Sequence, residues 1–170
     1  MAETGEVGRI ARHLTNDHAR LDVLLARAIA TPGTVDREAF DAFRAGLLRH
    51  IALEEKILLP AVRRARGETL PAFRQLRIEH GALASLLVPT PTPELVAEIQ
   101  SILVPHDARE EGPGGVYDEC DRLLGSDAEA LVSRMLAYPP VRVAPYSDGP
   151  RVLRSAEDAL RQSARSHGGR

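Results

Sequence analysis

One polar pattern occurs twice in this chain, on segments whose apolar periodicity otherwise predicts buried helices. DHARLDVLL, residues 17–25, aligns with EHGALASLL, residues 79–87, and HIALEE, residues 50–55, aligns with HDAREE, residues 106–111. In each half, one histidine of the first segment and a histidine and a glutamate of the second stand where an apolar side chain is expected. The chain therefore reads as two copies of one helical hairpin, which should pack with approximate twofold symmetry.

The hydrophobic periodicity predicts four long helices and no strands. We expect these helices over residues 7–30, 37–66, 71–88, and from residue 93 to beyond residue 110. Start signals support this division, because Asp36 can cap the second helix, Pro71 suits a first turn, and Thr92 can cap the fourth. Because the connections are short, we predict an all-α fold, an antiparallel up-down four-helix bundle.

Prolines and glycines mark the irregular parts of the chain. Pro60 should kink the second helix, and Pro105 should bend the fourth. GPGG at residues 112–115 interrupts the pattern. We predict a first domain over residues 1–138 and a Pro-rich, partly disordered tail over residues 139–170. Shorter helices are expected at about 116–124, 127–137 and 151–165.

The composition argues against several classes of protein. The net charge is −2 and no dense basic patch occurs, so we expect no nucleic-acid partner. Cys120 is the only cysteine, which excludes an intramolecular disulfide and a multi-cysteine zinc site. The first residues lack the apolar run of a signal peptide, and no segment has the length of a membrane span. We therefore expect a cytoplasmic protein without a membrane partner.

Six polar side chains of the repeat should point into the core. Residues four apart on a helix differ by about 40° in azimuth and about 6 Å along the axis, so each His-x-x-x-Glu pair faces one way. Burying such groups without partners costs on the order of several kcal/mol each. The six side chains are His18, His50, Glu54, His80, His106 and Glu110.

A metal centre would resolve that cost, because neutral imidazoles and ionised carboxylates are ligands of divalent metals. Six ligands exceed the need of one tetrahedral zinc ion. They suit two metals that each take two histidines, with the carboxylates bridging. This donor set favours iron, and manganese or zinc are the alternatives.

The order His…His-x-x-x-Glu…His…His-x-x-x-Glu on four helices resembles the hemerythrin-like, HHE cation-binding family. The resemblance covers about residues 10 to 124. It implies a hemerythrin-like four-helix bundle that holds two iron ions with an oxo or hydroxo bridge and binds O2, peroxide or NO. By that resemblance the iron ligands are His18 from the first helix, His50 and Glu54 from the second, His80 from the third, and His106 with a following acid from the fourth.

Two departures from the oxygen-carrying members of that family bear on the expected site. The carriers have His-x-x-x-His on the third helix, but Leu76 stands four residues before His80. The carriers also place the last carboxylate five residues after its histidine, at Glu111 here, whereas the internal repeat points to Glu110. Residues five apart diverge by about 140° on a straight helix. We therefore favour Glu110, and the GPGG interruption leaves Glu111 open.

The missing ligand favours reaction over reversible carriage, because catalytic metals keep coordination positions open. We predict oxidase, peroxidase or catalase-like oxidoreductase chemistry, for which an electron-donor partner is compatible. The alternative is a non-catalytic module that senses or stores iron, O2 or NO; a weaker third is one structural zinc or manganese ion. A substrate-sized pocket beside the metals would favour the enzyme. A seal formed by Leu14, Leu76, Phe43 and Leu103 would favour the sensor.

Residues beside the ligands have two readings each. Glu55, Glu111, Asp17 and Glu79 either accept hydrogen bonds from imidazole N–H groups or are plain surface charges. Tyr117 either donates a hydrogen bond to bound oxygen or only packs in the core. His13 should face away from the site. The C-terminal helix offers a surface for a homodimer.

Overall fold

The computed structural model describes residues 7–168, and all secondary structure within that range is helical. The all-α prediction is therefore confirmed. A π-helical turn, Glu54–Leu58, joins α2 to α3, and a 3-10 turn, Gly125–Asp127, joins α6 to α7. The helices are α1 (Arg9–Ala28), α2 (Arg37–Leu53), α3 (Leu59–Arg66), α4 (Pro71–Leu86), α5 (Pro93–Glu111), α6 (Val116–Leu124), α7 (Ala128–Leu136) and α8 (Ala156–His167).

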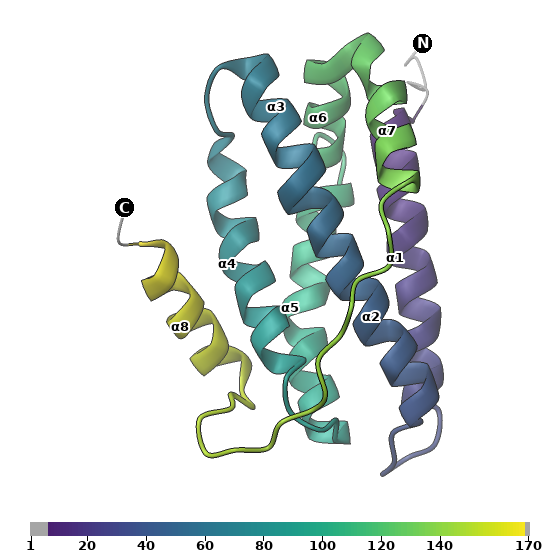
Figure 1. The fold of residues 1–170 in the computed structure, drawn as a ribbon, viewed down its shortest axis with the longest axis vertical. Coiled ribbons are helices and arrows are strands. Elements are labelled where there is room, and N and C mark those ends of the chain that lie inside the picture. The colour runs from purple at the N-terminus through teal and green to yellow at the C-terminus, as the bar shows by residue number, and fades with distance from the viewer. Residues whose placement is uncertain (1–6, 169–170) are drawn as a thin grey trace.

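Four long helical segments lie lengthwise beside one another (Figure 1). The chain runs along α1, returns through α2 and α3, reverses in α4 and returns in α5. The short helices α6 and α7 cover the end of the molecule at which α1 begins, and both contact α1. Within residues 7–168, no helix combines the length and the apolarity that crossing a membrane requires.

The predicted start signals are confirmed. Asp36 Oδ1 accepts a hydrogen bond of 3.1 Å from the Ala39 N–H at the start of α2. Thr92 Oγ1 accepts one of 3.2 Å from the Leu95 N–H at the start of α5, and Pro71 is the first residue of α4. The Asp36 and Thr92 side chains each satisfy an N–H that has no partner within its own helix, and Pro71 has no such N–H to satisfy. This explains why the helices begin where local sequence predicts.

The start of α1 is capped from a distant part of the chain. The Asp121 carboxylate on α6 accepts hydrogen bonds of 3.0 Å from the Ile10 N–H and 2.9 Å from the Ala11 N–H. A carboxylate is also favoured there by the partial positive charge of a helix N-terminus. This contact ties α6, and with it Tyr117, to α1.

The predicted kink at Pro60 takes the form of a π-helical turn. Proline has no N–H to donate, and its ring clashes with the carbonyl four residues earlier, which here belongs to Lys56. In the structure, the Leu59 N–H bonds to the Glu54 carbonyl, five residues earlier, so the turn before Pro60 is widened. π-Helical turns occur often at functional sites, and Glu54 is the first residue of this one.

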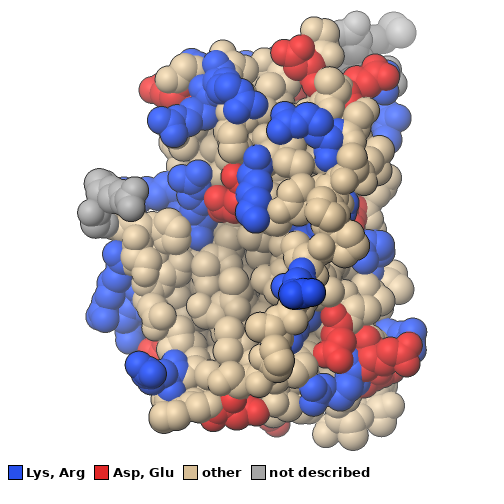
Figure 2. All heavy atoms as spheres, viewed as in Figure 1, with Lys and Arg blue, Asp and Glu red and all other residues tan. Residues whose placement is uncertain are grey.

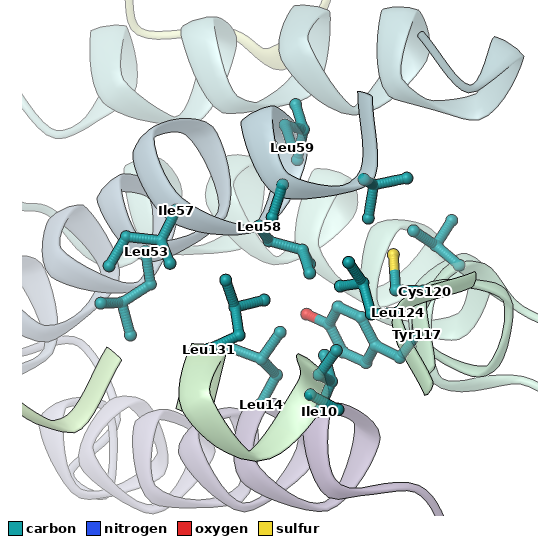
Figure 3. Close-up of a cluster of buried hydrophobic side chains, with 14 of the residues drawn as sticks. Ile10, Leu14, Leu53, Ile57, Leu58, Leu59, Tyr117, Cys120, Leu124 and Leu131 are labelled. Carbon is teal, nitrogen blue, oxygen red and sulfur yellow. The ribbon is translucent and has the colours of Figure 1, made fainter. Parts of the chain in front are cut away.

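The apolar stripes form two separate clusters of buried side chains. One cluster lies among α1, α3, α4, α6, α7 and the π-helical turn, and it contains Leu14, Leu58 and Tyr117. Figure 3 shows the Tyr117 ring among the aliphatic side chains of this cluster, with its hydroxyl pointing inward. The other cluster contains Phe43 and Leu83, and Ala159 of α8 joins it. The candidate metal ligands occupy the layer between the two clusters, because each replaces one position of an apolar stripe.

The C-terminal segment packs against the long helices. The Arg44 guanidinium donates to the Ala144 carbonyl (3.0 Å) and lies over the Tyr146 ring. The segment crosses the molecule in front of α2 (Figure 1), where Figure 2 shows a broad, mostly uncharged surface. The next helix, α8, begins five residues later than expected, because the Ser155 side chain caps it. The other predicted helix ends agree with the structure to within two residues.

Close packing of α8 on α4 depends on Gly81, where an added Cβ would lie 2.4 Å from Ser163 Oγ.

The predicted domain division at residue 138 and the predicted partial disorder of the tail stay predictions. The parts of these two predictions that concern residues 1–6 and 169–170 lie outside the described residues.

Candidate metal centre

The six predicted inward side chains meet in one buried layer. Each is at most 5% exposed. They come from four long segments: His18 from α1, His50 from α2 and Glu54 from the π-helical turn, His80 from α4, and His106 and Glu110 from α5.

These side chains form two groups whose donor atoms are close enough to surround a metal ion. Within each group all donor atoms lie within 4.8 Å of one another. The first group holds the His18 and His50 imidazoles, whose Nε2 atoms are 2.9 Å apart, together with Glu110. The second group holds Glu54, His80, His106 and Glu110.

Both carboxylates extend from one histidine pair to the other. Glu110 Oε2 lies 3.4 Å from His18 Nε2, and Glu110 Oε1 lies 3.3 Å from His106 Nε2. Glu54 Oε1 lies 3.6 Å from His50 Nε2, and Glu54 Oε2 lies 3.0 Å from His80 Nε2. Each carboxylate therefore presents one oxygen to each pair, which is the arrangement of a bridging ligand.

The structure places Glu110 and Glu111 on opposite sides of the His18 ring. Glu110 is fully buried among the donors. Glu111 accepts a hydrogen bond of 2.5 Å from His18 Nδ1 on the outer side, and its side chain is 31% exposed. Helix α5 continues through Glu111, so the two carboxylates point in the different directions that helical geometry dictates.

An acidic side chain holds the outer nitrogen of every histidine in the site. Besides Glu111 with His18, Asp17 accepts from His50 Nδ1 (3.0 Å) and Glu55 from His80 Nδ1 (2.8 Å). Glu79 accepts from His106 Nδ1 (2.8 Å). Such bonds set the tautomer and orientation of an imidazole and leave Nε2 free to bind a metal. The acids thus contact imidazoles, as one of their two readings predicted.

Each acid accepts a hydrogen bond from a histidine on a neighbouring helical segment, not from the histidine nearest to it in the sequence. Asp17 precedes His18 in the sequence but bonds to His50, and Glu79 precedes His80 but bonds to His106. Arginines that the sequence analysis did not single out hold three of the acids. Arg20 bonds to Asp17 (2.9 Å), Arg77 bonds to Glu55 (3.1 Å), and Arg109 bonds to Glu79. Two local spacings point to this outer layer, namely i, i+3 for Asp17 and Arg20 and i, i+4 for Gln75 and Glu79.

At two histidines, charged neighbours oppose the effect of burial on the pKa, whereas at Glu110 a charged neighbour adds to it. Burial alone would lower the pKa of His50, but Glu54 and Asp17 more than offset it and raise that pKa to about 10. In the same way, Glu54 and Glu55 overcome burial and raise the pKa of His80 to about 9. Burial raises the pKa of Glu110 well above its usual range, and the nearby Glu54 carboxylate adds to this. Two carboxylates this close favour a cation between them.

Two of the outer acids, Glu79 and Asp17, have lowered pKa values and remain ionised. Burial would raise the pKa of Glu79, but hydrogen bonds from His106, Gln75 and Arg109 lower it to about 2. The pKa of Asp17 is also lowered to about 2. Permanently charged acceptors of this kind keep the imidazole N–H on the outer nitrogen.

Three buried polar atoms of the second group support the fit to a cation. Glu54 Oε2, His80 Nε2 and Glu110 Oε1 make no hydrogen bond among the described residues. Their close approaches, Glu54 Oε2 to His80 Nε2 at 3.0 Å and Glu110 Oε1 to His106 Nε2 at 3.3 Å, join candidate donors to one another. Unpaired buried polar atoms are costly, and native structures rarely retain them without a reason. Metal coordination would satisfy all three atoms at once.

Two further residues bear on the limits of the site. Leu76, at the position of the missing histidine, is 2% exposed and belongs to the cluster with Leu14. His13 is in neither group of candidate donors.

Comparison with protein-family models gives one match, to the hemerythrin HHE cation binding domain, over residues 9–113. No curated protein and no solved structure matches the chain. The matched range covers more than half of the chain and contains all six inward donors, whereas Tyr117 and helices α6 to α8 lie beyond it.

Proposed function

The chain belongs to the hemerythrin HHE cation-binding domain family, and on this premise we propose that its buried histidines and glutamates hold two iron ions. Cation binding follows from family membership and fits the two groups of donors. The number of ions and their identity are our proposal. We propose also that the four long helical segments form the antiparallel four-helix bundle of that family.

The observation that carries the proposal of two ions is the span of the two carboxylates. Glu54 and Glu110 each direct one oxygen to the His18–His50 pair and the other to the His80–His106 pair. A single ion would use one group and leave the other unneutralised. Two histidines per ion with shared carboxylates suit iron, and manganese or zinc are the alternatives.

We propose further that the centre reacts with O2, peroxide or NO, in oxidoreductase chemistry. A pair of iron ions supplies one- and two-electron redox chemistry toward such molecules. The protein restricts access by burial, because Leu14, Leu76 and Phe43 are at most 2% exposed. A hollow of about 830 Å³ is lined by Glu111, and one of about 350 Å³ is lined by Glu55 and His80. None of the other five inward donors lines either hollow. This enclosure supports small molecules as substrates and argues against an organic substrate that contacts the ions.

The second candidate function is non-catalytic sensing or storage of iron, O2 or NO, and the same seal of apolar side chains favours it. Leu103, the fourth side chain of the expected seal, is 8% exposed. The two candidates differ in turnover. Peroxide disproportionation to water and O2 needs no external reductant, whereas an oxidase cycle needs an electron donor, which stays a prediction.

The test is the iron content of the full chain, followed by peroxide consumption. We expect about two irons per chain from the two groups of donors, with catalytic removal of peroxide. The variant His50→Ala should lose iron, and the matched control His13→Ala, which changes a histidine of α1 in neither group, should retain it. Iron bound without turnover would select the sensing or storage function. One zinc per chain, or no metal, would refute the di-iron proposal.

A further inference from the structure

The Tyr117 hydroxyl lies against the three donors of the first group and against Glu54 of the second group. Its oxygen is 2.6 Å from Glu54 Oε1 and 2.9 Å from Glu110 Oε2. It is also 3.3 Å from His18 Nε2 and 3.4 Å from His50 Nε2. The side chain is 1% exposed, and the packing of its ring fixes this position (Figure 3).

The two carboxylates compete for one proton. The hydroxyl has a single proton to donate, yet the Glu54 and Glu110 oxygens both lie within hydrogen-bond distance of it. A hydrogen bond to one carboxylate therefore leaves the close approach of the other without an account.

The spacing of these atoms matches that of ligands around one ion. First-row metals bind nitrogen and oxygen at about 2.0–2.2 Å, so adjacent octahedral ligands lie about 3.0 Å apart. The four donors form consecutive contacts of 3.6 Å (Glu54 to His50), 2.9 Å (His50 to His18) and 3.4 Å (His18 to Glu110). The Tyr117 oxygen lies between 2.6 and 3.4 Å from all four. Ligands that share one ion would show distances of this size.

We propose that Tyr117 is itself a ligand of the ion held by His18 and His50, bound through its phenolic oxygen. The proposal rests on the proposed iron centre. On binding, the O–H bond breaks, the proton leaves to solvent, and the oxygen lone pair bonds to the ion, without transfer of an electron. The competing role is a phenol that keeps its proton and donates a hydrogen bond to an oxygen bound in the centre.

The two halves of the repeat differ at this point. Tyr117 follows Glu110 by seven residues, and the residue seven after Glu54 is Ala61, which has no donor atom. Ala61 is 7% exposed and belongs to the same apolar cluster as Tyr117. The first ion would therefore have five protein donors and the second four, so the open positions would lie on the His80–His106 side.

The test is the absorption spectrum of the iron(III)-loaded full chain, because a phenolate bound to iron(III) gives a visible charge-transfer band. Excitation into that band should enhance phenolate ring vibrations in the resonance Raman spectrum. Tyr117→Phe should abolish both signals while the apolar ring still packs. Tyr138→Phe is the matched control, because Tyr138 packs against the same cluster and is in neither group of donors. That variant should retain both signals.

The outcomes separate this proposal from the one on which it rests. A wild-type chain with two irons and no phenolate signal overturns the ligand role of Tyr117 and leaves the di-iron centre standing. A signal that survives in Tyr117→Phe also overturns it. A wild-type chain that holds no iron overturns both proposals.

Discussion

Each acid that accepts a hydrogen bond from a histidine Nδ1 should affect the affinity of only the ion that this histidine would bind. Glu79→Gln is the sharpest test. Glu79 Oε2 accepts a hydrogen bond of 2.8 Å from His106 Nδ1, and His106 belongs to the second group only. Removing a partner of a ligating histidine usually lowers metal affinity about 10–100-fold. Glutamine keeps an oxygen acceptor and loses only the charge, so we expect about a tenfold loss, or about 1.4 kcal/mol.

The loss should be confined to one of the two ions. Asp17 holds His50 of the first group, so Asp17→Asn should weaken the other ion by a similar factor. Glu79→Gln also removes the ion pair with Arg109, whose side chain is 45% exposed although that of Glu79 is only 6% exposed. Glu38→Gln is a suitable control, because that side chain is 88% exposed.

The assay is stepwise removal of iron by a competing chelator. Wild type and Glu38→Gln should release both ions in the same concentration range. Glu79→Gln should release one ion at about tenfold lower chelator and keep the other unchanged. If both ions of Glu79→Gln bind within twofold of the wild-type affinity, a bond to the outer nitrogen does not set affinity here, and the reasoning fails.

Three further predictions concern stability. Asp121→Ala should lower the free energy of unfolding by about 1–2 kcal/mol, because α1 loses its cap, and a thermal melt would show a lower midpoint; an unchanged midpoint would refute this. Gly81→Val should displace α8 from α4, because the new side chain would collide with Ser163, and limited proteolysis of the C-terminal segment would detect it; wild-type resistance to cleavage would count against it. Without metal, His50 and His80 have folded-state pKa values of about 10 and about 9, above the unfolded value of 6.5. Their contribution to the free energy of unfolding is complete below pH 6.5, declines as the pH rises, and is lost once the pH passes 9 to 10. The urea midpoint of the metal-free chain should therefore fall between pH 6.5 and pH 10.

Local sequence predicted the helices and their inward faces. A stripe at a period of 3.6 residues depends only on the order of apolar and polar residues, and a cap such as Asp36 acts three residues away. The apolar pattern predicts the start of α8 five residues too early, because it does not reveal the cap at Ser155. The widened turn at Glu54 was expected only as a kink at Pro60, since a missing N–H can be accommodated in several ways.

The candidate site divides in the same way. That His18, His50, His80 and His106 face inward with two glutamates follows from the sequence, because helical spacing alone decides which face a residue occupies. Which acid holds which histidine depends on how far each helix is shifted and rotated against its neighbours. Packing of the side chains on facing helices sets that register, and no single segment contains it. The position of Tyr117 depends on tertiary structure most of all. Its hydroxyl reaches the donors only when α6 packs against the N-terminal end of α1, where Asp121 caps that helix.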